Sequence, residues 1–72
     1  MDRKKYLQLC QQNAVYPKSV IVWFDGIGYH PIEYRFGFDE KGNSVHKAVL
    51  HDLKANSIIN CPLEGVNENE KG

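Results

Sequence analysis

Val20-Ile21-Val22-Trp23-Phe24-Asp25-Gly26-Ile27-Gly28-Tyr29 places the pair Asp25-Gly26 between two apolar runs. An Asp-Gly pair in this setting is the strongest short-range signal for a β-hairpin with a type I′ turn, because both turn residues must adopt positive φ. Pairing across this turn places Val22 opposite Tyr29. The stretch therefore predicts an antiparallel hairpin at the start of the β region.

A second turn signal, Asp39-Glu40-Lys41-Gly42, follows an alternating run of residues. It is typical of a type I turn in which Gly42 takes the left-handed conformation that closes a bulged loop. Counting back from this turn places Ile32 opposite Leu50. One side of the alternating run is apolar and is predicted to be the core, and it consists of Ile32, Tyr34, Phe36 and Phe38.

The two hairpins disagree about which face is buried. Strict alternation continues the Ile32 face into Trp23, whereas a second apolar face contains Val20, Val22, Phe24, Ile27 and Tyr29. A bulge or bend near Gly28 to Pro31 resolves the conflict by rolling the sheet, since proline inside a strand is confined to such places. We therefore predict an α+β, mostly β fold, with a short N-terminal helix packed on a strongly bent antiparallel meander of four to five strands, as an SH3-like small barrel.

The helix is predicted over residues 3–13, with Asp2 as its N-cap. After the long hairpin, Asp52 to Asn56 is typical of a single helical turn, and residues 57–61 of a last strand. The predicted domain spans 1–66, with the meander over 19–63, and residues 67–72 are predicted to be a disordered tail.

The chain has 72 residues and a formal net charge of zero. This length indicates one domain near the lower limit for a self-sufficient core, and the charge argues against a mainly electrostatic nucleic-acid binder. Residues 1–5 are followed by a polar stretch without the apolar segment of a signal peptide, and no apolar run approaches membrane-spanning length. Cys10 and Cys61 are predicted to be reduced, partly buried thiols, so we expect a cytoplasmic protein without a membrane partner.

The chain resembles a group of short uncharacterised proteins that phages and prophages of Firmicutes encode. The residues that carry the resemblance are Phe24-Asp25-Gly26, Tyr29, Pro31, Tyr34, Phe38-Asp39, Gly42, His46, Ala48, Leu50 and Asp52-Leu53-Lys54-Ala55-Asn56-Ser57. The resemblance covers most of the chain, although Tyr16-Pro17-Lys18 makes a shorter connection than members of the group have. It implies a phage accessory protein in a bacterial host cytoplasm, where many such proteins counter host defence.

Histidines are the first candidates for chemistry. The deduced register pairs His30 with Asp52 and His51 with Pro31, and a histidine oriented by a carboxylate is typical of metal ligation or general-base catalysis. The ordinary interpretation is that two strands place polar groups together at the end of a sheet. No third ligand stands at a set spacing and no nucleophile stands beside a base, so we predict no enzyme activity, no metal and no cofactor.

Aromatic and basic residues are the second candidates. Trp23, Tyr29, Tyr34 and Phe36, with Arg35 and Lys47, can form a platform for single-stranded nucleic acid. The alternative is that these aromatic residues are the core, and that Arg35 and Lys47 are solvated charges with Glu33 nearby. The candidate binding residues are Trp23, Tyr29, His30, Arg35, Lys47 and His51.

We therefore expect a non-enzymatic binding module that inhibits a host defence system by occupying a host protein or a small signalling ligand. The alternative is a small nucleic-acid-binding regulator of phage gene expression or replication. A homodimer is a further expectation, through Val20, Val22 and Tyr29 or through the edge of the strand Ile58 to Cys61. The helix can instead seal that face and leave a monomer.

Overall fold

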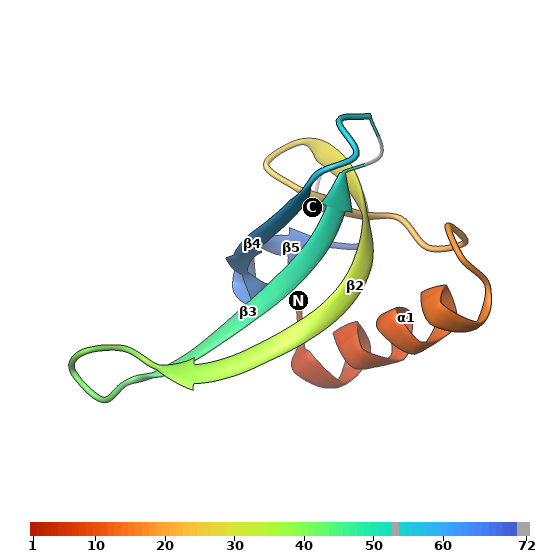
Figure 1. Cartoon of the computed structure of the whole chain (residues 1–72). Helices are drawn as coiled ribbons and strands as arrows, with labels where there is room; N and C mark the ends of the chain where they lie inside the picture. The colour runs from red at the N-terminus through yellow and green to blue at the C-terminus, as the bar shows by residue number, and fades with distance from the viewer. Residues whose placement is uncertain (53, 71–72) are drawn as a thin grey trace.

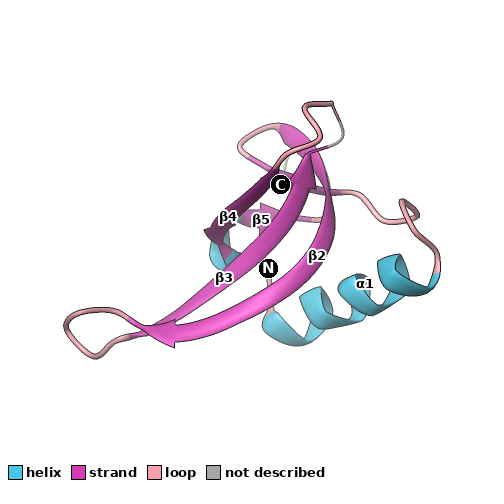
Figure 2. Ribbon diagram, in the orientation of Figure 1, coloured by secondary structure: helices cyan, strands magenta, loops and turns pink. Residues whose placement is uncertain are grey.

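The computed structural model describes residues 1–52 and 54–70 and contains one helix beside a five-stranded sheet (Figure 1). The elements are α1 (Arg3–Val15), β1 (Val22–Phe24), β2 (Ile27–Phe38), β3 (Ser44–Asp52), β4 (Ile58–Pro62), the 3-10 helix η1 (Leu63–Gly65) and β5 (Val66–Asn67). All strand pairs are antiparallel, and the strand order is β4-β3-β2-β1-β5 (Figure 2). The predicted helix-plus-meander fold is confirmed, as a strongly bent sheet that does not close into a complete barrel.

Helix α1 begins at the predicted cap. The Asp2 carboxylate accepts a hydrogen bond from the Lys5 backbone nitrogen at 3.3 Å, which satisfies one of the free N–H groups at the helix start. The helix continues to Val15, two residues beyond the predicted end at 13, and Tyr16 caps it by donating its N–H to the Gln12 carbonyl.

Both predicted turns form. Asp25 and Gly26 have φ values of 53° and 78°, as a type I′ turn requires, and Val22 pairs with Tyr29. Gly42 has a φ of 82°, and the Asp39 carboxylate accepts hydrogen bonds from two backbone nitrogens within the second turn. The local sequence therefore determines the positions of both hairpins.

A β-bulge lies at Ile32. Pro31 pairs with Leu50 and Glu33 with Val49, so Ile32 is an extra residue in β2 and its predicted pairing with Leu50 is wrong. The bulge lies just after the predicted interval from Gly28 to Pro31. Because one extra residue reverses the alternation, Tyr29 and Tyr34 face the same side of the sheet, which resolves the conflict between the two hairpins.

The core lies on that shared side, between α1 and the first part of the sheet. Its fully buried side chains include Tyr6, Val22, Leu50 and Val66. Of the predicted second face, Val20, Val22 and Tyr29 are buried in this core and Phe24 packs against it partly buried, whereas Ile27 is 49% exposed. The Tyr6 hydroxyl contacts the carbonyls of Glu33 and Val49 at 2.9 and 3.0 Å, directly beside the bulge.

The prediction that Phe36 and Phe38 belong to the core is wrong. They are 54% and 69% exposed, and Ile32 is 44% exposed. Figure 1 shows the reason: the end of the β2–β3 hairpin projects beyond α1 and the other strands, so nothing in the described chain covers its apolar side.

The last third of the chain largely follows the prediction, with the last predicted strand, 57–61, observed as Ile58–Pro62. The Asp52 carboxylate accepts hydrogen bonds from the Lys54 and Ala55 nitrogens, and Asn56 is left-handed, but residue 53 of the predicted helical turn lies outside the described residues. Asn67, predicted to begin the disordered tail, pairs with Trp23 in β5. Residues 71–72 of that tail also lie outside the described residues.

The two cysteines, Cys10 and Cys61, are free, as predicted. Cys61 is buried in the core, and Cys10 packs against it partly buried. None of the helices in the described part of the chain has the length and hydropathy needed to span a membrane.

Candidate binding surface on the β2–β3 hairpin

The predicted binding residues do not form one site. Tyr29 and His30 are only 5% and 7% exposed, so neither is available to a partner. His30 Nδ1 lies 2.7 Å from the Val20 carbonyl oxygen, and because a carbonyl only accepts, Nδ1 carries the proton and donates. His30 therefore holds the connection before β1 against β2.

The predicted pairings of His30 with Asp52 and of His51 with Pro31 are both wrong, because the bulge shifts the register. His30 pairs with His51, and Asp52 pairs with Tyr29. The Asp52 carboxylate instead caps the following turn by accepting hydrogen bonds from the Lys54 and Ala55 backbone nitrogens. These hydrogen bonds lower the pKa of the Asp52 carboxyl. His51 Nε2 hydrogen-bonds the Asn56 side-chain oxygen at 2.9 Å. In residues 1–52 and 54–70, no group of three or more side chains is arranged to hold a metal ion.

Arg35 and Lys47 are directly opposite each other, as predicted, and Glu33 lies 3.6 Å from the Arg35 guanidinium. Trp23 lies near the other end of β2, where it pairs with Gly28. Its ring covers that glycine so closely that a Cβ there would meet it at 3.1 Å. The predicted platform of Trp23 with Arg35 and Lys47 is therefore not assembled.

Four other side chains form a continuous row on the uncovered side of the hairpin, which we call the aromatic row: Tyr34, Phe36, Phe38 and His46. The Phe36 and Phe38 rings meet edge to face with centroids 5.3 Å apart, and Phe36 lies 5.0 Å from the His46 ring. The Tyr34 hydroxyl is hydrogen-bonded to His46 Nδ1, and these two rings stack. The row is therefore ordered by its own contacts, although much of it faces solvent.

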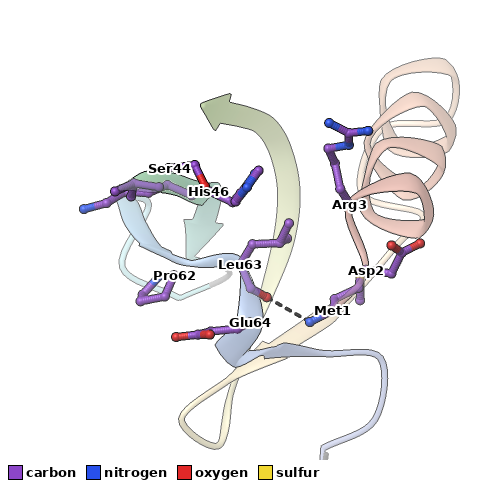
Figure 3. Close-up of a pocket in the computed structure, with 10 residues that line it drawn as sticks. Met1, Asp2, Arg3, Ser44, His46, Pro62, Leu63 and Glu64 are labelled. Atoms are coloured by element: carbon purple, nitrogen blue, oxygen red, sulfur yellow. Dashed lines mark hydrogen bonds between the residues drawn. The ribbon is translucent and has the colours of Figure 1, made fainter. Parts of the chain in front are cut away.

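A groove of about 690 Å³ adjoins the aromatic row at His46 (Figure 3). It separates β3 from the start of α1, with the segment after β4 beside Met1, whose backbone nitrogen donates to the Leu63 carbonyl at 2.9 Å. The charged residues that line it are of both signs: Arg3, Lys47, Asp2 and Glu64.

The groove does not show the geometry of a hydrolase. Ser44 and His46 are two residues apart in β3, and both line the groove. However, His46 Nδ1 is engaged by Tyr34 rather than by an orienting carboxylate.

The sequence allowed Tyr34 and Phe36 to be either part of a binding platform or part of the core, but it did not predict the aromatic row, because Phe38 was assigned to the core and His46 was not considered as a binding residue. One signal was present: the expected flanking strands, over 20–24 and 57–61, are shorter than the two long strands that they adjoin. Short neighbours cannot cover the full length of a long hairpin, so its far end is exposed.

Comparison with known protein families, with curated proteins and with solved structures found no match.

Proposed function

We propose that this protein is a non-enzymatic binding module that holds a partner protein on the aromatic row. The observation that carries the proposal is the exposure of Phe36 and Phe38 together, at the end of a hairpin whose base is packed into the core. Contiguous exposed apolar side chains are uncommon on small soluble domains and mark interaction sites. Aromatic anchors also contribute most of the binding free energy in many interfaces.

The groove beside the row supports a protein as the partner. An apolar row joined to a groove with balanced charge matches a polypeptide segment that has apolar anchors and few charges of either sign. Arg35 and Lys47 alternate with the residues of the aromatic row and point to the other side of the hairpin, so the row itself does not carry the concentrated positive charge that attracts nucleic acid.

The biological setting of the proposal comes from the sequence resemblance. A phage accessory protein in the cytoplasm of a bacterial host would use such a surface to occupy a host defence protein and inhibit it. Alternatively, the partner is a small signalling ligand that occupies the groove and contacts only the part of the aromatic row beside it.

The second candidate is a nucleic-acid-binding regulator, and the observation that favours it is the exposed Arg35–Lys47 pair. Two cations directly opposite each other repel, so a phosphate between them would relieve the repulsion. Salt-dependent retention on single-stranded DNA or RNA that Arg35→Ala and Lys47→Ala each reduce would favour this candidate.

Site-specific photo-crosslinking tests the main proposal. A photoreactive phenylalanine analogue replaces Phe38 in one preparation and Ile58 in another, because Ile58 is similarly exposed at 63% but lies on β4. In host extract, we expect a defined protein adduct from position 38 and none from position 58. Equal adducts from both positions, or none from position 38, would contradict the proposal.

A further inference from the structure

We propose that the outer edge of β2 at Tyr34, Phe36 and Phe38 pairs with the same edge of a second copy of the chain. The result is a two-fold symmetric dimer with one sheet continuous across both hairpins. This inference extends the binding role proposed above for the same hairpin, but it concerns the backbone edge rather than the aromatic side chains, so each can fail without the other.

The first step is that this edge has no neighbouring strand. β1 pairs with β2 only at residues 27–29, and β3 occupies the other side of β2 along its length. Helix α1 reaches this edge at Pro31, whose carbonyl accepts a hydrogen bond from the Asn13 side chain. In the described chain, no backbone or side-chain partner lies along β2 beyond Glu33 on this side.

The backbone N–H and C=O groups that face outward along this edge follow from the hydrogen bonding of the β2–β3 ladder. The Asp39 nitrogen donates to the Asn43 carbonyl at 2.9 Å, so this closing pair is hydrogen-bonded. In an antiparallel ladder, hydrogen-bonded pairs alternate with non-hydrogen-bonded pairs. Gly37 and Arg35 therefore bond to β3, and the N–H and C=O groups of Tyr34, Phe36 and Phe38 point away from it.

The third step is that the edge is complementary to itself. An antiparallel register centred on Phe36 places it opposite Phe36 of the second copy, and places Tyr34 opposite Phe38 on both sides of the axis. These pairs would exchange about six backbone hydrogen bonds, and the symmetry is that of an isologous dimer. The two aromatic rows would then join on one face, where cross-strand aromatic pairs are favourable.

The fourth step is the charge on the opposite face. In this register, Arg35 lies opposite Gly37 of the second copy and diagonal to its Asp39. Glu33 lies opposite that same Asp39, and the Arg35 guanidinium, 3.6 Å from the Glu33 carboxylate, offsets the repulsion between the two carboxylates. Gly37 has no heavy atom within 4 Å of the position of a Cβ, and a hollow of about 380 Å³ beside it is lined by Arg35 and Lys47. The edge at Gly37 therefore has room for the Arg35 side chain of the second copy, and the Asp39 carboxylate lies near that position.

The dimer surfaces expected from the sequence fit less well. Val20, Val22 and Tyr29 are sealed in the core, which leaves nothing for a second copy to contact. The edge of β4 ends in Pro62, which lacks an N–H and interrupts strand pairing. The end of β2 contains no proline beyond Pro31.

Charge-swap variants at the proposed two-fold axis test the inference. Phe36→Lys and Phe36→Glu each place two like charges opposite each other, so we expect each to weaken self-association by about tenfold or more in sedimentation equilibrium. An equimolar mixture of the two should recover a species of twice the 8.3 kDa chain mass. Ile58→Lys, on the β4 edge, is the matched control and should dimerise as the unchanged chain does.

Residue-resolved amide exchange on the unchanged protein is an independent readout. We expect the Phe36 amide to become protected as the concentration rises, while the Gly37 amide is protected at every concentration. A monomeric mass up to millimolar concentration, no recovery in the mixture, or loss of the dimer in Ile58→Lys would overturn the proposal. A foreign protein adduct at position 38 without self-association would retain the binding role and reject the dimer.

Discussion

The two halves of the long β2–β3 hairpin have the same alternation of apolar and polar residues but different surroundings. In the half near α1, Leu50 and Ala48 are fully buried, whereas at the far end Phe36 and Phe38 are more than half exposed. The alternation predicts correctly that these side chains share a face. It does not predict whether another element lies over that face, because cover depends on the lengths of α1, β1 and β4.

The packed half of the hairpin contributes to the stability of the fold, whereas the exposed far end is available for recognition of a partner. Buried apolar area stabilises the fold by about 25 cal/mol per Å², so the packed half contributes most of the hydrophobic free energy of folding. The same kind of area at the far end remains in contact with water until a partner covers it. Substitutions in the two halves should therefore affect different measurements.

Deletion of Ile32 should have the largest effect on the fold. It removes the bulge residue, so the faces before and after it would no longer coincide, and either Tyr29 or Tyr34 would turn away from the core. We expect a loss of more than about 3 kcal/mol in the free energy of unfolding, measured by urea denaturation. Ile32→Ala is the control and should cost much less, since the side chain is 44% exposed. Equal effects would mean that the side chain, not the extra residue, is what matters.

Leu50→Ala should come next. Leu50 is fully buried, so the substitution leaves a cavity and should cost about 2–5 kcal/mol in the free energy of unfolding. Phe38→Ala removes a larger side chain but should cost less than about 1 kcal/mol, because Phe38 is 69% exposed. Thermal and urea unfolding of both variants check the comparison, and a greater loss for Phe38→Ala would show that the far end is packed.

Tyr6→Phe should have an intermediate effect. The substitution keeps the ring in the core but removes the hydroxyl that contacts the Glu33 and Val49 carbonyls. We expect a loss of about 1–2 kcal/mol in the free energy of unfolding. Burial raises the pKa of the Tyr6 phenol, so the folded state holds this proton more tightly and its stability falls as pH rises through the alkaline range. The variant should lose part of this alkaline dependence, and an unchanged alkaline profile would contradict the assigned environment.

Asp39→Asn should have the smallest effect on stability, and only in acid. Hydrogen bonds from the Asn43 and Lys41 backbone nitrogens lower the pKa of the Asp39 carboxyl below 3.8. The folded state therefore favours the ionised form, so this contribution is present above about pH 4 and is lost as pH falls below it. The asparagine keeps an acceptor without the charge, so its acid unfolding curve should be flatter. A curve parallel to that of the unchanged chain would exclude this role.

Much of the fold could be predicted from the sequence because its signals are local. Asp25-Gly26 and Gly42 adopt the positive φ that their turn types require, and these two turns set the antiparallel pairing of β1 with β2 and of β2 with β3. The conflict between two apolar faces also indicated a bulge, although its position at Ile32 depends on contacts that only the folded chain has. One of them is the Tyr6 hydroxyl beside the Glu33–Val49 pair.

The binding surface was harder to predict, for a physical reason. Phe36 and Phe38 are apolar residues of the kind found in cores. They are exposed because the neighbouring helix and strands are too short to cover the far end of the β2–β3 hairpin. The same limitation misplaced Tyr29 and His30, which are polar enough to suggest a site but are covered in the folded chain. Of the predicted contacts, the Arg35–Lys47 pair is confirmed, because it depends only on counting back from the second turn.

The double variant Phe36→Ser/Phe38→Ser tests most directly whether the far end of the hairpin serves recognition rather than stability. Its free energy of unfolding and its capture of the partner adducted at position 38 are measured on the same preparation, beside Ile58→Ser. We predict a change in unfolding free energy within about 1 kcal/mol of the unchanged chain and loss of capture, while Ile58→Ser retains both. A loss of several kcal/mol, or full capture by the double variant, would contradict this assignment.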